Sequence, residues 1–198
     1  MSKREQTLQK YVGNMLSIEQ SILSAVKRQS QADEVKLMPE ANQLISKIEK
    51  TLNRHVMGLE QHLKNIGGGS SGGVMQTVAK ALGVATGVLD QVRPDKVSEM
   101  LRDDYVSLNL AAIGYTMLCT TSLAFIDQIT TTIASDNLKE LTPLITEINE
   151  VMPQIVIQEI SDESETFDST ITDEAIRLTQ SAWDGDHVHQ NHAHPWQV

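Results

Sequence analysis

The stretch from residue 97 to residue 134 constrains the fold most, because its apolar side chains recur at steps of three and four. That spacing places them on one side of a single helix. At 1.5 Å per residue the helix would be roughly 55 Å long. A domain of 198 residues can bury such a helix only against partner helices of similar length. The positions of this seam are Leu101, Tyr105, Leu108, Ala112, Tyr115, Cys119, Ser122, Ile126, Ile129 and Ile133.

Two partner helices are predicted in the first third of the chain, over residues 4–29 and 40–66, joined by a polar connection. Glu19 lies in the apolar register of the first helix, where a carboxylate needs a partner or a raised pKa. The first inner face is Leu8, Val12, Met15, Ile22 and Val26. The second is Ala41, Ile45, Ile48, Leu52, His55, Leu59, His62 and Ile66.

A fourth long helix is predicted to begin near Ser135 or Asp136, both of which are good N-caps, and to end near Ile160. Pro143 and Pro153 lie inside its apolar pattern, and each removes a backbone donor, so we expect a kink or a break there. Its face is Leu138, Leu141, Ile145, Ile148, Met152, Ile155 and Glu159.

The predicted fold class is all-α, a four-helix bundle with a long crossover and a flexible C-terminal tail. Residues 67–73, GGGSSGG, predict a flexible segment, and residues 74–89 predict a short helix. A connection of this length can cross the full length of a bundle. We therefore expect a bundle over residues 1–160 and, over residues 161–198, an acidic linker, a short helix at 172–182 and a His-rich tail.

Composition limits the partners and the compartment. The formal charge is −10 with no stripe of Lys and Arg, so nucleic acid is not an expected partner. The single cysteine and a charged, amphipathic N-terminal segment are typical of a cytoplasmic protein. The weakly charged run 106–125 contains Ser, Asn, Gly and Thr, which favours a buried helix over a membrane span.

Three segments, YVGNMLSIEQSILSAV (11–26), HVMGLEQHLKNIG (55–67) and LNLAAIGYT (108–116), resemble the ferritin-like superfamily. The chain is most similar to ferritin-like stress proteins of the YciE/YciF type, over about residues 5–160. The resemblance implies four long helices, frequent dimers, a role in stress response and a dimetal site in the core.

The dimetal site that the resemblance implies needs a Glu from each of two helices and a Glu-x-x-His from each of the other two. Glu19 matches the first carboxylate and His55 matches one histidine. Leu52 stands where the Glu before that histidine belongs, the helix over 97–134 has no matching Glu, and neither Glu147 nor Glu150 is followed by a histidine. With two of about six ligands present, we expect that the dimetal centre has been lost and that no residue is catalytic.

The main prediction is therefore a protein that acts by binding or assembly, as a homodimer or with a protein partner, and that is not an enzyme. No outer stripe is expected to be plainly apolar. In the core, we expect a buried hydrogen bond between Glu19 and His55. Tyr115 is expected to be a core residue whose hydroxyl finds a partner.

Two metal hypotheses stand beside this prediction. Glu19, His55 and His62 are candidate ligands for iron, manganese or zinc, which would make the chain a metal-dependent oxidoreductase or a metal-storage protein. The tail carries a second candidate set, because closely spaced imidazoles on a flexible chain bind metal ions without fixed geometry. The alternative interpretation is a disordered acidic tail without a physiological metal role. The tail set is His187, His189, His192 and His194.

Overall fold

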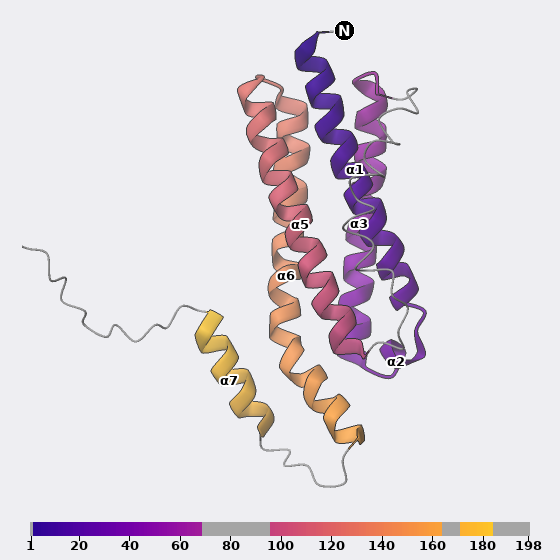
Figure 1. Cartoon of the computed structure of the whole chain (residues 1–198), viewed down its shortest axis with the longest axis vertical. Coiled ribbons are helices and arrows are strands. Elements are labelled where there is room, and N and C mark those ends of the chain that lie inside the picture. The colour runs from indigo at the N-terminus through magenta and orange to yellow at the C-terminus, as the bar shows by residue number, and fades with distance from the viewer. Residues whose placement is uncertain (1, 69–95, 164–170, 184–198) are drawn as a thin grey trace, which may run out of the picture.

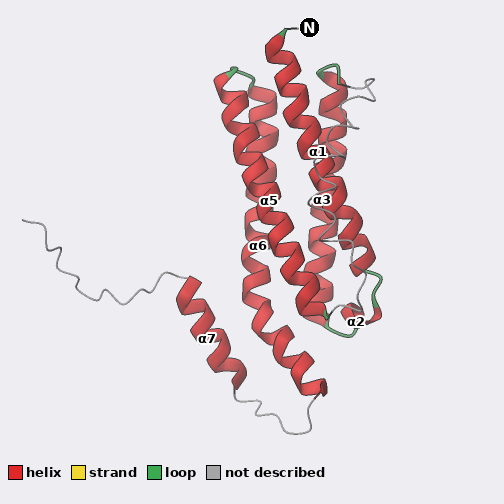
Figure 2. Ribbon diagram, viewed as in Figure 1, coloured by secondary structure: helices red, strands yellow, loops and turns green. Residues whose placement is uncertain are grey.

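The computed structural model describes residues 2–68, 96–163 and 171–183, and these residues form helices and short connections with no strand (Figures 1 and 2). The predicted all-α class is therefore confirmed. The helix predicted at 74–89 and the tail histidines lie outside the described residues. The helices are α1 (Lys3–Gln29), α2 (Asp33–Lys36), α3 (Pro39–Asn65), α5 (Val97–Ala124), α6 (Gln128–Glu163) and α7 (Ile171–Trp183).

The four long helices enclose one hydrophobic core. α1 packs against α3 and α5, and α6 packs against the same two helices. α1 and α6 run in one direction, and α3 and α5 run in the other (Figure 1). The short α2 packs on α3, and α7 packs on α6. The largest fully buried side chains are Tyr115, Leu44, Ile45, Ile48, Leu52, Leu59, Leu101, Leu108, Leu118, Leu141, Ile148 and Ile155.

α1 and α3 follow the sequence prediction closely. Ser2 and Glu5 form a capping box at the start of α1, which satisfies two otherwise unpaired backbone donors. α3 begins with Pro39 at its first position, where the missing N–H costs nothing. The predicted inner positions of both helices are buried, except that Ile66 is half-buried. The predicted polar connection contains the four-residue helix α2.

The long helix predicted from 97 to 134 is wrong. α5 ends at Ala124, the chain turns at residues 125–127, and α6 begins at Gln128. Ile126 has a positive φ of 56°, and the Asp127 carboxylate accepts a hydrogen bond from the Thr130 N–H at 3.0 Å. Asp127 therefore acts as the N-cap that was expected at Ser135 or Asp136. The apolar period runs through both helices, so it does not show the turn.

The inner face of α5 is also rotated from the predicted seam. The seam positions Leu101, Leu108, Tyr115 and Ser122 are buried. Ile126, in the turn, and Ile129, in α6, are 84% and 67% exposed because the chain has left α5. Tyr105, Ala112 and Cys119 are only half-buried. The positions that are buried in addition are Val97, Asp104, Ser107, Ala111 and Leu118.

α6 is continuous through Pro143 and Pro153, so of the predicted kink or break, the break does not occur. Pro143 is exposed and Pro153 half-buried, so the carbonyl groups that lose a donor lie within reach of solvent. Apolar residues on either side of Pro143, Leu141 and Leu144, are buried in the core. This packing outweighs the missing backbone bond.

Gly58 provides a test of how α3 is stabilised. It lies in the middle of the helix, and a Cβ added there would meet no atom within 4 Å. Because glycine is a poor helix former, we expect Gly58→Ala to raise the free energy of unfolding by about 0.5–1 kcal/mol in urea denaturation.

Gly114→Ala is the matched control for that prediction. A Cβ at Gly114 would lie 2.5 Å from Sδ of Met15, so repacking of α1 against α5 offsets the gain in helix propensity. An equal stabilisation by both substitutions would contradict the close approach of these two helices.

Candidate functional site

The site is built around Glu19, which lies halfway along α1 and is completely buried. Its Oε1 accepts a hydrogen bond from the Tyr115 hydroxyl at 2.7 Å. The same oxygen lies 3.0 Å from Nδ1 of His55. The expected hydrogen bond between Glu19 and His55 is therefore present, and Tyr115, from α5, is a second donor to the same carboxylate.

α6 closes the network from the other side. Nε2 of His55 lies 3.0 Å from Oε2 of Glu140, and the Arg54 guanidinium donates to that same oxygen at 2.5 Å. Asn137 donates to the Tyr115 hydroxyl oxygen at 2.8 Å. The network thus joins side chains from all four long helices.

Both ring nitrogens of His55 have a carboxylate partner. A neutral imidazole has one N–H, but both ring nitrogens of His55 face carboxylate oxygens. A ring with an N–H on both nitrogens can donate to both carboxylates, and charges then alternate from Glu19 through His55 and Glu140 to Arg54. Oppositely charged groups in direct contact offset the cost of removing them from water.

The surroundings also shift the pKa values of Tyr115 and Glu140, each in the direction that preserves its role in the network. Burial, together with the charge of Glu19, raises the pKa of Tyr115, so the phenol keeps the proton that it donates. The hydrogen bond from Arg54 lowers the pKa of Glu140, whose side chain is 45% exposed. Glu140 therefore remains a carboxylate.

The network is a poor metal site as it stands. A histidine binds a metal through a nitrogen lone pair, and neither ring nitrogen of His55 is free. Among the described residues, no group of three or more His, Cys, Asp or Glu side chains is placed to hold one ion. Arg54 also brings a positive charge to the carboxylate that such an ion would use.

Two features nevertheless point toward a ligand. Oε2 of Glu19 is buried and has no hydrogen-bond partner in the described structure. The 3.0 Å between His55 Nε2 and Glu140 Oε2 is also about the separation of two neighbouring ligands that each lie roughly 2.1 Å from one octahedral ion; in a tetrahedral zinc site they would be roughly 3.4 Å apart. These features are the structural basis for a second candidate function.

His62 does not join Glu19 and His55. It lies seven residues further along α3, and its Nε2 is 2.8 Å from the Thr130 hydroxyl at the start of α6. Burial lowers its pKa. The structure thus brings together two of the three candidate core ligands and places the third in a contact between helix ends.

Glu140 and Asn137 were missed by the sequence prediction. They lie three residues apart, beside the predicted face of α6, and that spacing is the only signal that could have singled them out. The two carboxylates that were considered lie elsewhere. Glu147 pairs with Lys47 on the surface, and Glu150 is exposed.

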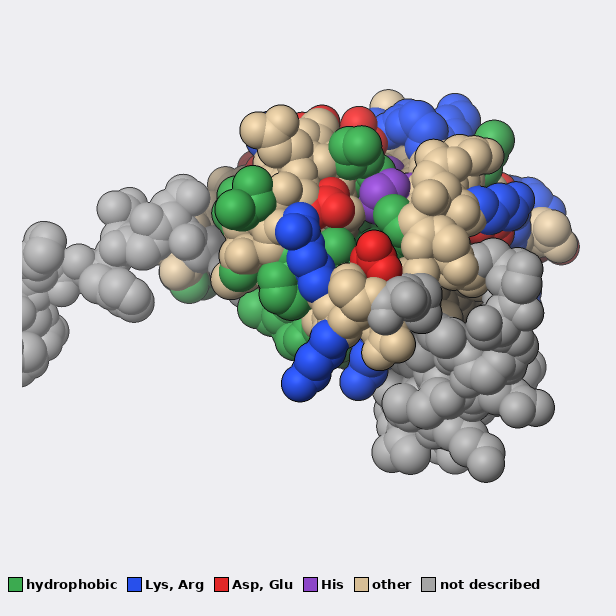
Figure 3. Space-filling view, turned by 90° about the horizontal axis from the view of Figure 1, so that it is seen from above, with side chains coloured by type: hydrophobic (Ala, Val, Ile, Leu, Met, Phe, Trp, Pro, Cys, Tyr) green, Lys and Arg blue, Asp and Glu red, His purple; other side chains and the backbone are tan. Residues whose placement is uncertain are grey.

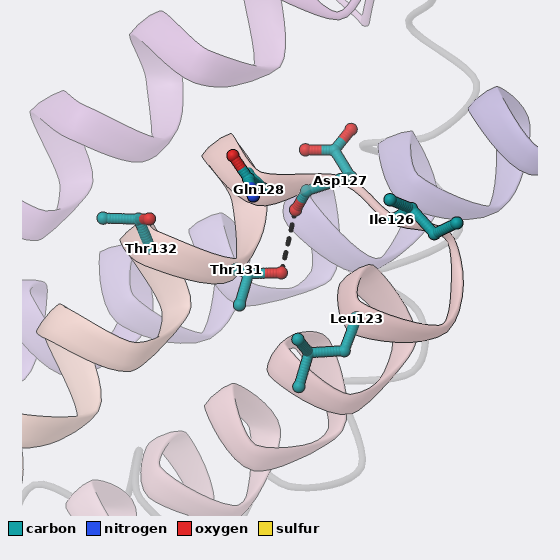
Figure 4. Close-up of a pocket in the computed structure, with 6 residues that line it drawn as sticks. All are labelled: Leu123, Ile126, Asp127, Gln128, Thr131 and Thr132. Atoms are coloured by element: carbon teal, nitrogen blue, oxygen red, sulfur yellow. Dashed lines mark hydrogen bonds between the residues drawn. The ribbon is translucent and has the colours of Figure 1, made fainter.

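A pocket of about 360 Å³ lies at the turn between α5 and α6 (Figure 4). It is lined by Leu123, Ile126, Asp127, Gln128, Thr131 and Thr132. The Thr131 hydroxyl donates to the Asp127 backbone carbonyl at 2.8 Å, and the Asp127 carboxylate caps α6. These polar groups therefore stabilise the turn, and none of the network residues lines the pocket.

A second buried carboxylate, Asp104 on α5, lies away from the network and is 2% exposed. Its Oδ1 accepts a hydrogen bond from Nε2 of Gln29 at 3.1 Å. Oδ2 of Asp104 and Oε1 of Gln29 are both buried without a partner in the described structure. Burial raises the pKa of Asp104 to about 7, so below that pH the carboxyl group keeps a proton and can act as a donor.

The raised pKa predicts how stability depends on pH. Between the ordinary value of 3.8 and about 7, the folded chain keeps a proton that the unfolded chain releases. The contribution of Asp104 to the free energy of unfolding therefore falls as pH rises through this range and is constant above it. Asp104→Asn supplies a permanent N–H donor. We therefore expect the difference in free energy of unfolding between Asp104→Asn and the wild type to favour the variant more at pH 8 than at pH 5.

Urea denaturation of the wild type and of Asp104→Asn at the two pH values measures this effect. Asp173→Asn is the control, because Asp173 is an exposed carboxylate on α7, which packs on α6, whereas Asp104 lies on α5. Equal pH dependence in Asp104→Asn and the wild type would show that Asp104 is not protonated in the folded state.

Comparison with models of protein families, with curated proteins and with solved structures found no match. The geometry of the Glu19 network and the arrangement of the helices that carry it are therefore the basis for a functional proposal.

Proposed function

We propose that this chain is a ferritin-like four-helix protein that has lost its dimetal centre and acts by binding or assembly. The arrangement of the helices supports the proposal. α3 ends and α5 begins at opposite ends of the four long helices, and these two helices run parallel (Figure 1). A bundle with one long crossover has this arrangement.

The contacts of His55 carry the proposal. In a ferritin-type centre the histidine and carboxylates converge on metal ions. Here His55 contacts the Glu19 and Glu140 carboxylates through its two ring nitrogens. Leu52, where the carboxylate of a Glu-x-x-His pair would stand, is fully buried among apolar side chains.

A hydrogen-bonded network of this kind has a structural role. Its hydrogen bonds form together only when the helices lie in one register, so the network favours one arrangement of the four helices. The activity is then supplied by the surface, through a homodimer or another protein partner. The charge of −10 disfavours nucleic acid. The proposal includes a cytoplasmic location, which the composition favours, and a role in stress response, which the resemblance implies.

The alternative function is a metal-dependent oxidoreductase or a metal-storage protein with one iron, manganese or zinc ion. The unpartnered Oε2 of Glu19 and the 3.0 Å between His55 and Glu140 favour it. The ion would replace the proton between His55 and Glu140, and Arg54 would have to move away from the carboxylate.

Metal content separates the two functions. We expect no stoichiometric iron, manganese or zinc, by mass spectrometry, in a full-length variant whose four tail histidines are replaced by serine. The melting temperature of that variant should not change with added metal or with a chelator, because both ring nitrogens of His55 already face carboxylate partners.

The result that would contradict the proposal is stoichiometric metal in the tail variant, lost in His55→Gln and Glu140→Gln and retained in His62→Gln. Metal that binds only when the tail histidines are present would locate binding in the tail and would leave the proposal for the core intact.

A further inference from the structure

α5 carries a second apolar face on its outside, contrary to the expectation that no outer stripe is plainly apolar. Val106, Leu110, Ile113 and Met117 are 61%, 43%, 56% and 51% exposed. They follow one another at steps of four, three and four residues, so they lie along one line of the helix. We name these four residues the outer stripe.

The outer stripe has the spacing of a coiled-coil seam. The same steps lead on to Thr120 and Ala124, which are exposed and uncharged. From Val106 to Ala124 the line is roughly 27 Å long at 1.5 Å per residue. In the view from above, hydrophobic side chains gather on the side of the molecule where α5 and α6 lie (Figure 3). A second helix is the kind of surface that fits such a line.

Charge limits which partners fit the outer stripe. Residues 105–126 contain no Asp, Glu, Lys or Arg, in a chain whose formal charge is −10. Two copies of so acidic a chain repel each other wherever their carboxylates meet. The outer stripe has no such groups, and it offers neither carboxylates to a basic partner nor Lys and Arg to an anionic membrane.

We infer that the outer stripe of α5 packs against the same stripe of a second copy. The inference rests on the proposed function, assembly or binding, and names the surface through which two copies would assemble. Such an interface is isologous and closes as a two-fold dimer. We place the two-fold axis between Leu110 and Ile113, with the helices antiparallel.

The antiparallel arrangement follows from Asp103, which lies one step before Val106 on the same line. Parallel helices would bring the two copies of Asp103 face to face. With the antiparallel axis at Leu110 and Ile113, Val106 instead meets Met117, and Asp103 meets Thr120. The four largest apolar side chains then pair with one another.

Two other occupants are outcomes of the test. By length and composition α5 could cross a membrane, with 33% of its most apolar stretch buried. However, its inner side carries Asp104 and Tyr115, which are bound to α1. The other alternative occupant is a segment of the same chain, residues 69–95, which lie outside the described residues.

Sedimentation equilibrium of the full-length protein tests the inference. We expect a dimer in the wild type and a monomer in Ile113→Glu, with affinity weakened roughly 100-fold or more because a charge lies at the centre of the interface. Met57→Glu is the matched control. Met57 is 70% exposed on α3, away from the outer stripe, and this variant should remain dimeric and helical.

A monomeric wild type would overturn the inference. If Ile113→Glu then also lowered the melting temperature, the stripe would be covered within its own chain. Binding of the wild type to vesicles of neutral lipid, lost in Ile113→Glu, would identify a membrane instead. A monomer without core metal refutes the dimer alone, whereas a dimer with stoichiometric core metal refutes only the lost centre.

Discussion

The structure depends on the carboxylate of Glu19, a charge placed at zero exposure in the middle of α1. An ionised carboxylate without partners in such a place would be destabilising by several kcal/mol. Tyr115 and His55 satisfy one of its oxygens. The other ring nitrogen of His55 faces a second carboxylate, Glu140, and Arg54 pairs with that carboxylate at the surface. One buried charge thus determines contacts that reach from the core to solvent.

The same network connects the interior of the molecule with its exposed surface. Because Tyr115 bonds to Glu19 inside the core, the rotation of α5 about its own axis is fixed. The residues on the opposite side of that helix, Leu110, Ile113 and Met117, are then held at the surface. A polar network that selects one helix register is therefore consistent with a protein whose activity lies in its outer faces.

How much could be predicted varied with how clearly each helix separates apolar from polar residues. α1 and α3 have polar outer faces, so their boundaries and inner residues were largely correct, as was the level of His55 beside Glu19. α5 is apolar on several sides, and its period gave no unique inner face. The turn at residues 125–127 lacks glycine and proline, and Asp127 was therefore overlooked as an N-cap.

Those errors explain why half of the site was missed. With the start of α6 placed seven or eight residues late, Asn137 and Glu140 fell in its first turn and not beside Tyr115. The expected loss of the dimetal centre needed only the residue type at single positions, such as Leu52, which is buried in α3. The pairing of Arg54 with Glu140 depends on the contact between α3 and α6, which a sequence pattern does not contain.

The protonation state of His55 tests the central claim most directly. Nitrogen-15 NMR of the imidazole rings, with His55→Gln and His62→Gln for assignment, measures it at neutral pH. The account predicts that both ring nitrogens of His55 carry a proton and that added zinc does not change their signals. A neutral His55 with a bare Nε2 that shifts on adding one equivalent of zinc would contradict it, since that nitrogen would be free to bind metal.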